Sequence, residues 1–228
     1  MPAISIDFGQ PIAIFPLPNC VLLPHATIPL HIFEPRYRRM LSDVLHADRV
    51  MAMALFAGDG WRRDYEGSPA LRPTVCVGHV ARDQLLPDGR SNILLQGVCR
   101  AAIVEEVPHH PYRRARLRPL EESTPMEIDL SDTRAELDEL LADPLLRQLA
   151  SVNSMHQWIS GEVPTQAMID LAIMCLSDDT ETRYRLLDEP SLHQRAQWLR
   201  RELKSTRRTL ALAERLGPAT SPDGLPLN

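Results

Sequence analysis

The sequence predicts an α+β protein with a β-rich first half and a helical second half. Up to about residue 126, short runs of Val, Ile and Leu are bounded by Pro, Gly, Asn or Asp, as in β-strands. From about residue 127, apolar residues recur every three or four positions, as in amphipathic helices. We therefore predict a β-rich subdomain at residues 1–126, a helical bundle at residues 127–216 and a disordered tail at residues 217–228.

The first subdomain is expected to contain many short strands, which is typical of a β-sandwich or a β-barrel. The strands are predicted near residues 12–17, 20–23, 27–32, 50–56, 75–83, 91–96, 98–107 and 113–121. The run Leu86-Pro87-Asp88-Gly89 places Pro, Asp and Gly where a tight turn uses them. The strands on either side of this turn should therefore pair as a hairpin.

One helix interrupts these strands. Pro35 suits the first helical position, and apolar residues follow at helical spacing. The apolar stripe consists of Tyr37, Met40, Leu41, Val44 and Leu45. This stripe should pack against the sheet.

The second half is predicted to form four helices before a final long one. Ser131 can cap the first of them, and a second should follow Pro144 and continue through Leu149 to Ile159. Pro164 opens a third, which is apolar on two sides and should be buried, and a short fourth is expected at residues 180–188.

The final helix should begin after Ser191 and end before Gly217. Its apolar residues alternate at spacings of four and three, a narrow packing seam that is compatible with a homodimer through this C-terminal helix. The seam consists of Leu192, Ala196, Leu199, Leu203, Thr206, Leu210 and Ala213. The basic residues on its other faces are typical of a solvated helix surface.

Composition excludes several classes of protein. The net charge of −5 argues against a protein built mainly for nucleic acid. No apolar run is long enough to span a membrane and the first residues do not resemble a signal peptide, so we expect a cytoplasmic protein without a membrane partner. The four cysteines form no CxxC pair, which predicts buried reduced thiols and neither a metal site nor a cofactor.

The stretch from Pro11 to Tyr37, reading PIAIFPLPNCVLLPHATIPLHIFEPRY, closely resembles the opening of the substrate-recognition domain at the N-terminus of the Lon protease family. Further likeness lies at Val77–Val80, at Asp88–Ala101 and at Pro111–Ala115. The resemblance extends over roughly residues 11–216. It implies a distorted, PUA-like β-barrel with one packed helix, followed by an α-helical bundle that ends in a long helix.

The family couples this domain to an ATPase and a protease. The sequence has no GxxxxGK(S/T) loop to hold phosphates, and its single lysine, Lys204, lies among arginines on a helix, where nothing should activate it as a catalytic base. We therefore expect no enzymatic activity and no catalytic residues.

The resemblance implies a non-catalytic module that binds exposed apolar segments of unfolded or partner proteins, by an apolar groove or by adding a strand to a sheet edge. The candidate peptide-binding residues lie where the Pro-rich strands meet the first helix: Leu17, Pro18, Leu30, Phe33 and Tyr37. One alternative is RNA binding through the arginines at positions 113, 114, 116 and 118, and another is an enzyme of unrecognised chemistry.

Overall fold

A computed structural model describes residues 4–65, 67–108, 111–120, 127–159 and 163–216. The chain divides into two compact units, which are described separately below. The first is Met1–Glu122 with Ser177–Pro190, and the second is Ser123–Leu176 with Ser191–Asn228. The predicted disordered tail, residues 217–228, lies outside the described residues.

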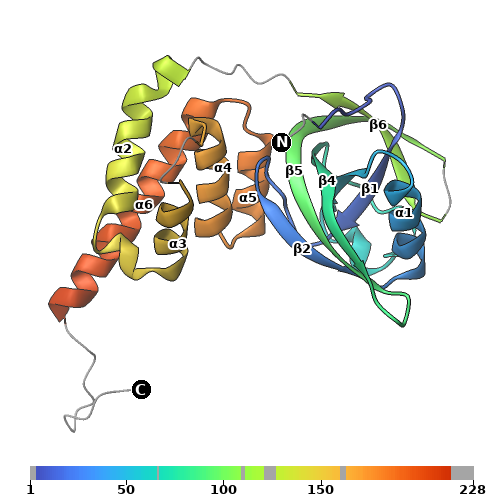
Figure 1. Cartoon of the computed structure of the whole chain (residues 1–228), viewed down its shortest axis with the longest axis horizontal. Helices are drawn as coiled ribbons and strands as arrows, with labels where there is room; N and C mark the ends of the chain where they lie inside the picture. The colour runs from blue at the N-terminus through green and yellow to red at the C-terminus, as the bar shows by residue number, and fades with distance from the viewer. Residues whose placement is uncertain (1–3, 66, 109–110, 121–126, 160–162, 217–228) are drawn as a thin grey trace, which may run out of the picture. The chain divides into compact units, whose positions relative to one another are not determined.

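The first unit contains a six-stranded sheet in the order β2-β5-β4-β3-β1-β6 (Figure 1). The strands are β1 Ile12–Leu17, β2 Thr27–Ile32, β3 Val50–Leu55, β4 Thr74–Leu85, β5 Ser91–Val107 and β6 Arg113–Pro119. All pairings are antiparallel except that of β1 with β3. A further pairing joins β5 to β6, so that five strands follow one another in a closed circuit.

Two strand predictions were wrong. Residues 20–23 are buried at Val21, Leu22 and Leu23 but form no strand, because apolar character signals burial and not pairing. The two strands predicted at 91–96 and 98–107 are one continuous strand of 17 residues, β5, which runs through Gly97.

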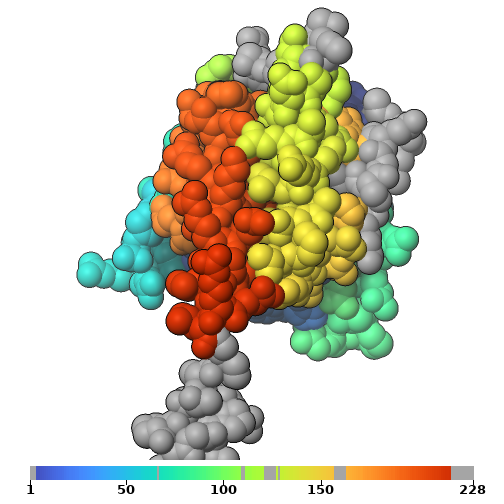
Figure 2. Space-filling model, turned by 90° about the vertical axis from the view of Figure 1, so that its left-hand side faces the viewer, coloured from blue at the N-terminus to red at the C-terminus, as the bar shows by residue number. Residues whose placement is uncertain are grey.

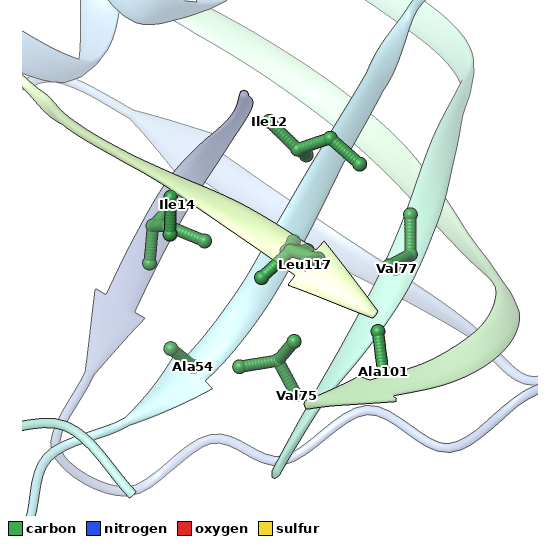
Figure 3. Packing of buried hydrophobic residues seen from close by; sticks show 9 residues of the cluster. Ile12, Ile14, Ala54, Val75, Val77, Ala101 and Leu117 are labelled. Atoms are coloured by element: carbon green, nitrogen blue, oxygen red, sulfur yellow. The ribbon is translucent and has the colours of Figure 1, made fainter. Parts of the chain in front are cut away.

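The core of the first unit lies between the strands of this circuit (Figure 3). Side chains of alternate residues point to the same side of a strand, so each strand contributes every second residue. The cluster consists of Ile12, Ile14, Ala52, Ala54, Val75, Val77, Ala101, Ala115 and Leu117. Their side chains point toward one another from β1, β3, β4, β5 and β6.

Helix α1, Pro35–Leu45, buries four of the five residues of its predicted stripe and half-buries Leu45. Its first turn is fixed by polar and aromatic contacts. The guanidinium of Arg36 donates to Glu34 at 3.0 Å and lies 4.5 Å and 4.7 Å from the ring centres of Tyr37 and Tyr65. Tyr65 also donates its hydroxyl proton to Glu34 at 3.0 Å. These contacts attach the start of α1 to the loop after β3, which contains the short 3₁₀ helix η1, Gly60–Arg62.

Helix α5, Thr180–Asp188, belongs to the first unit, whereas the sequence placed it in the helical bundle. Thr74 of β4 donates its main-chain N–H to the hydroxyl of Tyr184 at 3.1 Å and its own hydroxyl proton to Asp188. Arg100 of β5 donates to the carbonyl of Glu189 at 2.5 Å. Helical periodicity in the sequence indicates that one side of a helix is apolar, but it does not indicate which hydrophobic core that side packs against.

The second unit is helical, as predicted, and also contains two 3₁₀ helices. Its elements are η2 Glu127–Leu130, α2 Ser131–Ala142, η3 Leu146–Gln148, α3 Ala150–Ile159, α4 Thr165–Leu176 and α6 Leu192–Leu216. The predicted second helix is interrupted because Leu149 has an extended backbone. Helix α4 is the most buried of them, although Cys175 near its end is exposed. Of the four thiols predicted to be buried, only that of Cys76 is, and Cys20 and Cys99 are half-buried.

Helix α6 begins as predicted, because the Ser191 side chain accepts the N–H of Gln194 at 3.3 Å. Its buried residues end at Leu203, so only the first half of the predicted seam is buried. Figure 2 shows α6 beside α2, where Glu136 forms ion pairs with both Arg200 and Lys204. Several of the basic residues on α6 are therefore neutralised within the unit.

Candidate functional site: a groove on β2, β5 and β4

Three neighbouring strands of the first unit form a groove of about 430 Å³. The strand register arranges its lining as three rows, each with one residue from β2, β5 and β4. The rows are Pro29–Leu94–Arg82, Leu30–Ile93–Asp83 and His31–Asn92–Gln84. Because directly opposed residues share a face, the first and third rows lie on one face of the sheet and the middle row lies on the other.

Two local features of the β4–β5 hairpin produce this arrangement. The turn predicted at Leu86–Gly89 is confirmed: Leu86 donates to the Arg90 carbonyl at 2.8 Å, and Gly89 has a φ of 79°, which glycine adopts readily. A register irregularity between Val80 and Arg82 shifts the pairing of β4 with β5 by one residue. Asp88 accepts two hydrogen bonds from Arg90, which lower the pKa of Asp88 to about 2. In Figure 1, β4 and β5 run side by side to this turn.

The groove contains one charge that is not compensated. Asp83 forms an ion pair with Arg49 at 2.5 Å, and the same guanidinium donates to the Val80 carbonyl at 2.9 Å. Arg82 is exposed, and its guanidinium has no hydrogen-bond or ion-pair partner in the described part of the chain. The groove therefore presents a positive charge to solvent.

The polar row contains an internal hydrogen bond between two side chains. The ring Nδ1 of His31 lies 2.8 Å from Oδ1 of Asn92. A carboxamide oxygen only accepts hydrogen bonds, so Nδ1 is the donor in this contact.

Two large apolar side chains are exposed near one end of these strands. Phe33 follows β2 directly, is 57% exposed and stacks on the His31 ring at a centroid distance of 6.0 Å. Leu85 is 74% exposed and lies opposite Ser91, which in turn lies opposite Ile32. The strand register thus brings Phe33 and Leu85 to the same end of the sheet, in neighbouring rows whose side chains lie on opposite faces.

The outer edge of β2 is a poor template for an added strand. Gly97 donates to the carbonyl of Ala26, which shows that the main-chain groups of Ala26 point toward β5. In an antiparallel pair, the main-chain groups of successive residues point alternately toward and away from the neighbouring strand. By alternation from Ala26, the main-chain groups of Thr27, Pro29 and His31 point away from β5, and among the described strands β2 pairs with β5 alone. Pro29 has no N–H, so one donor of this edge is missing.

The structure brings only part of the predicted peptide-binding set to this groove. Leu30 lines it and Phe33 lies beside it. Leu17 and Pro18 are half-buried at the end of β1 and do not line it. Tyr37 is 3% exposed and packs edge-to-face on Phe15 at 4.6 Å.

The sequence analysis missed the contributions of β4 and β5, of which Arg82 and Leu94 matter most. The hairpin turn was recognised, and counting outward from it would have paired Gln84 with Asn92. The irregularity at Val80 and the pairing with β2 leave no local signal in the sequence.

A second hollow, of about 500 Å³, lies beside α1 and β1, but its polar groups contact one another. Asp43 accepts the hydroxyl proton of Tyr112 at 3.0 Å and pairs with Arg39 at 3.1 Å. Arg114 donates to the carbonyl of Pro11 at 2.5 Å. We therefore take the groove with the uncompensated charge as the candidate site.

Two of the four arginines on strand β6 are paired with carboxylates. Arg113 pairs with Glu106 at 2.5 Å, and Arg116 pairs with Glu105 at 2.9 Å. Arg118 remains exposed at the end of the strand. The two ion pairs reduce the positive charge that the strand presents to a nucleic acid.

Comparison with known proteins places the fold among the N-terminal domains of Lon proteases. The N-terminal domain of a Mycobacterium avium complex Lon protease superposes with a TM-score of 0.66 at 12% identity, covering 86% of this chain and 98% of that one. A Lon N-terminal domain protein from Xanthomonas campestris superposes with a TM-score of 0.57 at 19% identity, covering 83% and 96%. These likenesses establish a shared fold.

Residues 11–205 match the family model of the ATP-dependent protease La (LON) substrate-binding domain, and the chain belongs to this family. Lon protease 2 of Myxococcus xanthus is 29% identical over 148 residues, which are 60% of this chain and 17% of that protein. The Lon protease of Trichlorobacter lovleyi is 30% identical over 151 residues, which are 66% and 17%. The chain thus matches less than a fifth of the length of these relatives, and the match is to the substrate-binding domain, not to a catalytic one. None of the described helices is long and apolar enough to cross a membrane.

Proposed function

We propose that this chain binds extended segments of other proteins in the groove on β2, β5 and β4, as a substrate-recognition module that performs no chemistry itself. The observation that supports this proposal is the groove, which is lined in part by Pro29, Leu30 and Leu94, with Phe33 exposed beside it. A groove lined by apolar side chains is typical of surfaces that bind a partner. Membership of the substrate-binding family makes a protein segment the natural occupant.

The side chains in the groove suit binding better than catalysis. The Asp83 carboxylate is paired with Arg49, and the His31 ring is hydrogen-bonded to Asn92. The lining contains no serine, cysteine or lysine to act as a nucleophile. Apolar side chains next to amides and one cation can hold a peptide by packing and hydrogen bonds.

We further propose that a bound segment lies over the face of the groove and does not extend the sheet at β2. Pro29 removes one main-chain donor from that edge, and strand addition relies on an unbroken row of such groups. The closed circuit of strands behind the groove suits a PUA-like barrel, which would hold the face rigid while a segment binds.

The test compares two exposed apolar residues of the same unit. Phe33 is 57% exposed beside the groove, and Val104 is 62% exposed on the distal half of β5. Binding of fluorescently labelled, reduced and carboxymethylated α-lactalbumin, which is permanently unfolded, is measured by anisotropy for the wild type, Phe33→Asp and Val104→Asp. We expect Phe33→Asp to weaken binding about tenfold or more, as loss of a buried aromatic anchor does, and Val104→Asp to bind as the wild type does.

Circular dichroism and thermal melts verify that both variants remain folded. Equal binding by all three proteins, or equal loss in both variants, would overturn the assignment of the groove. Native α-lactalbumin is the control for the client, and it should bind far more weakly than the unfolded form. An added RNA should not compete; competition by RNA would favour nucleic-acid binding.

A further inference from the structure

We infer that the groove selects protein segments in which an acidic side chain lies within two positions of an apolar one. This inference rests on the proposed function and adds the chemical class of the segment. It follows from the position of Arg82 in the groove and from the pairing of the charges around it.

The charges close to the groove leave a positive excess. Asp83 is neutralised by Arg49, and Asp88 at the turn is neutralised by Arg90, each at 2.5 Å. Arg82 has no partner in the described part of the chain. The whole chain has a net charge of −5, so the positive groove is a local feature and not a consequence of composition. A carboxylate in the bound segment would supply the missing partner, since guanidinium groups bind carboxylates in a planar, two-point geometry.

A second cation lies near the same hairpin. Arg38 of α1 is exposed, and its guanidinium lies against Gly89 in the turn, where an added Cβ atom would collide with it. Arg38 also has no ion-pair partner among the described residues. Arg38 thus adds a cation at the hairpin turn, whereas Arg82 lies in the row of the groove farthest from that turn, and both charges disfavour a basic segment.

The strand register shows which side chains lie next to Arg82. Arg82 lies opposite Leu94, which lies opposite Pro29. The guanidinium is therefore at one end of a row whose other two side chains are apolar. Neighbouring strands are about 4.8 Å apart, and residues two apart on an extended segment are separated by about 6.6 Å. An apolar side chain placed on Leu94 thus puts the next side chain on the same face within reach of Arg82.

The experiment uses three 12-residue peptides that share one apolar, unstructured sequence and differ at a single central position: Glu, Gln or Lys. Affinities are measured by anisotropy at low and high salt for the wild type, Arg82→Glu and the control Arg118→Glu. Arg118 is an exposed arginine of β6 outside the groove. It has the same side chain as Arg82, and its substitution by Glu changes the net charge of the protein by the same amount.

We expect the wild type to bind the Glu peptide about fivefold more tightly than the Lys peptide, as a partly exposed ion pair permits, with the preference falling at high salt. Arg82→Glu should reverse the order, and Arg118→Glu should keep it. If Arg82→Glu keeps the wild-type order, or if both variants lose it equally, the inference is wrong.

The two proposals fail in distinguishable ways. If all three peptides bind equally to the wild type and Phe33→Asp still abolishes binding, the inferred preference for acidic segments is wrong, whereas the groove remains the binding site. If no peptide binds and the unfolded protein does not bind either, the proposed function itself is wrong.

Discussion

Substitution of Gly97 by alanine should strongly destabilise the first unit. A Cβ atom at this position would lie closer than 3.0 Å to the main-chain carbonyl oxygen of Leu23, 2.9 Å from the carbonyl carbon and 3.1 Å from Sγ of Cys76. The obstacle is mainly backbone, so it cannot rotate away as a side chain would. Gly97 also donates to the carbonyl of Ala26 at 2.8 Å and accepts the N–H of His25 at 2.9 Å.

The expected loss follows from these two effects. Overpacking in a tight interior costs about 1–3 kcal/mol. Separation of β5 from the segment before β2 weakens two main-chain hydrogen bonds, each with a net contribution of about 1 kcal/mol. The free energy of unfolding should therefore fall by about 3–5 kcal/mol, measured by urea denaturation, with hydrogen exchange of the β5 amides as a readout local to this unit.

Gly60→Ala is the matched control, because an added Cβ atom at Gly60 has no neighbour within 4 Å. Its backbone is not among those with positive φ, so alanine is tolerated there and the unfolding free energy should stay the same or rise by about 0.5 kcal/mol. A Gly97→Ala protein within about 1 kcal/mol of the wild type would refute the reasoning, since it would mean that Leu23 does not lie where the structure has it.

Three further predictions concern other parts of the chain. Arg195→Met should cost the second unit about 3–5 kcal/mol in urea unfolding, because it removes the guanidinium that pairs at 2.5 Å with the fully buried carboxylate of Asp170. Adding Asp170→Leu should recover most of the loss. Tyr184→Phe should lower the stability of the first unit by about 1–2 kcal/mol, because a buried N–H of β4 loses its acceptor; an unchanged urea midpoint would contradict this. Hydrogen bonds from Lys204 and a neighbouring arginine hold the pKa of Glu136 below its ordinary value. The pKa of Glu136 is lower in the folded than in the unfolded state, so its ion pairs stabilise the fold above the unfolded pKa of about 4.3, and this stabilisation is lost as pH falls through the folded-state pKa. The melting temperature of Glu136→Gln should therefore fall less steeply in acid than that of the wild type, as thermal melts would show.

Features encoded locally could be predicted from the sequence. The stripe of α1 follows from spacings of three and four residues, and the turn at Leu86–Gly89 follows from the conformational preferences of Pro, Asp and Gly. The capping of α6 by Ser191 is equally local. Each of these depends on residues within a few positions of one another.

Features that depend on pairing between distant residues could not be predicted. The segment at residues 20–23 is as apolar as a strand but is buried unpaired, with Leu23 against Gly97. In the candidate site, Leu30 and Phe33 were expected, whereas Arg82 enters only through a register irregularity that shifts β4 against β5. Tyr37 was expected both in the apolar stripe of α1 and among the binding residues, and the structure buries it against Phe15, as the stripe predicts.

The long strand β5 explains why the groove lies where it does. Its first part, from Ser91 to Gln96, is flanked by β2 and β4, and its last part, from Ala101 to Val107, pairs with β6. The exchange of neighbours takes place around Gly97, where the chain before β2 crosses so closely that no side chain fits. Beyond that crossing, alternate residues of β5 such as Ile93 and Leu95 remain buried, and the residues between them, on the other face, are free to serve another purpose. Binding and stability are therefore separable in this unit: substitutions at Arg82 or Phe33 should change affinity alone, whereas Gly97→Ala should remove both.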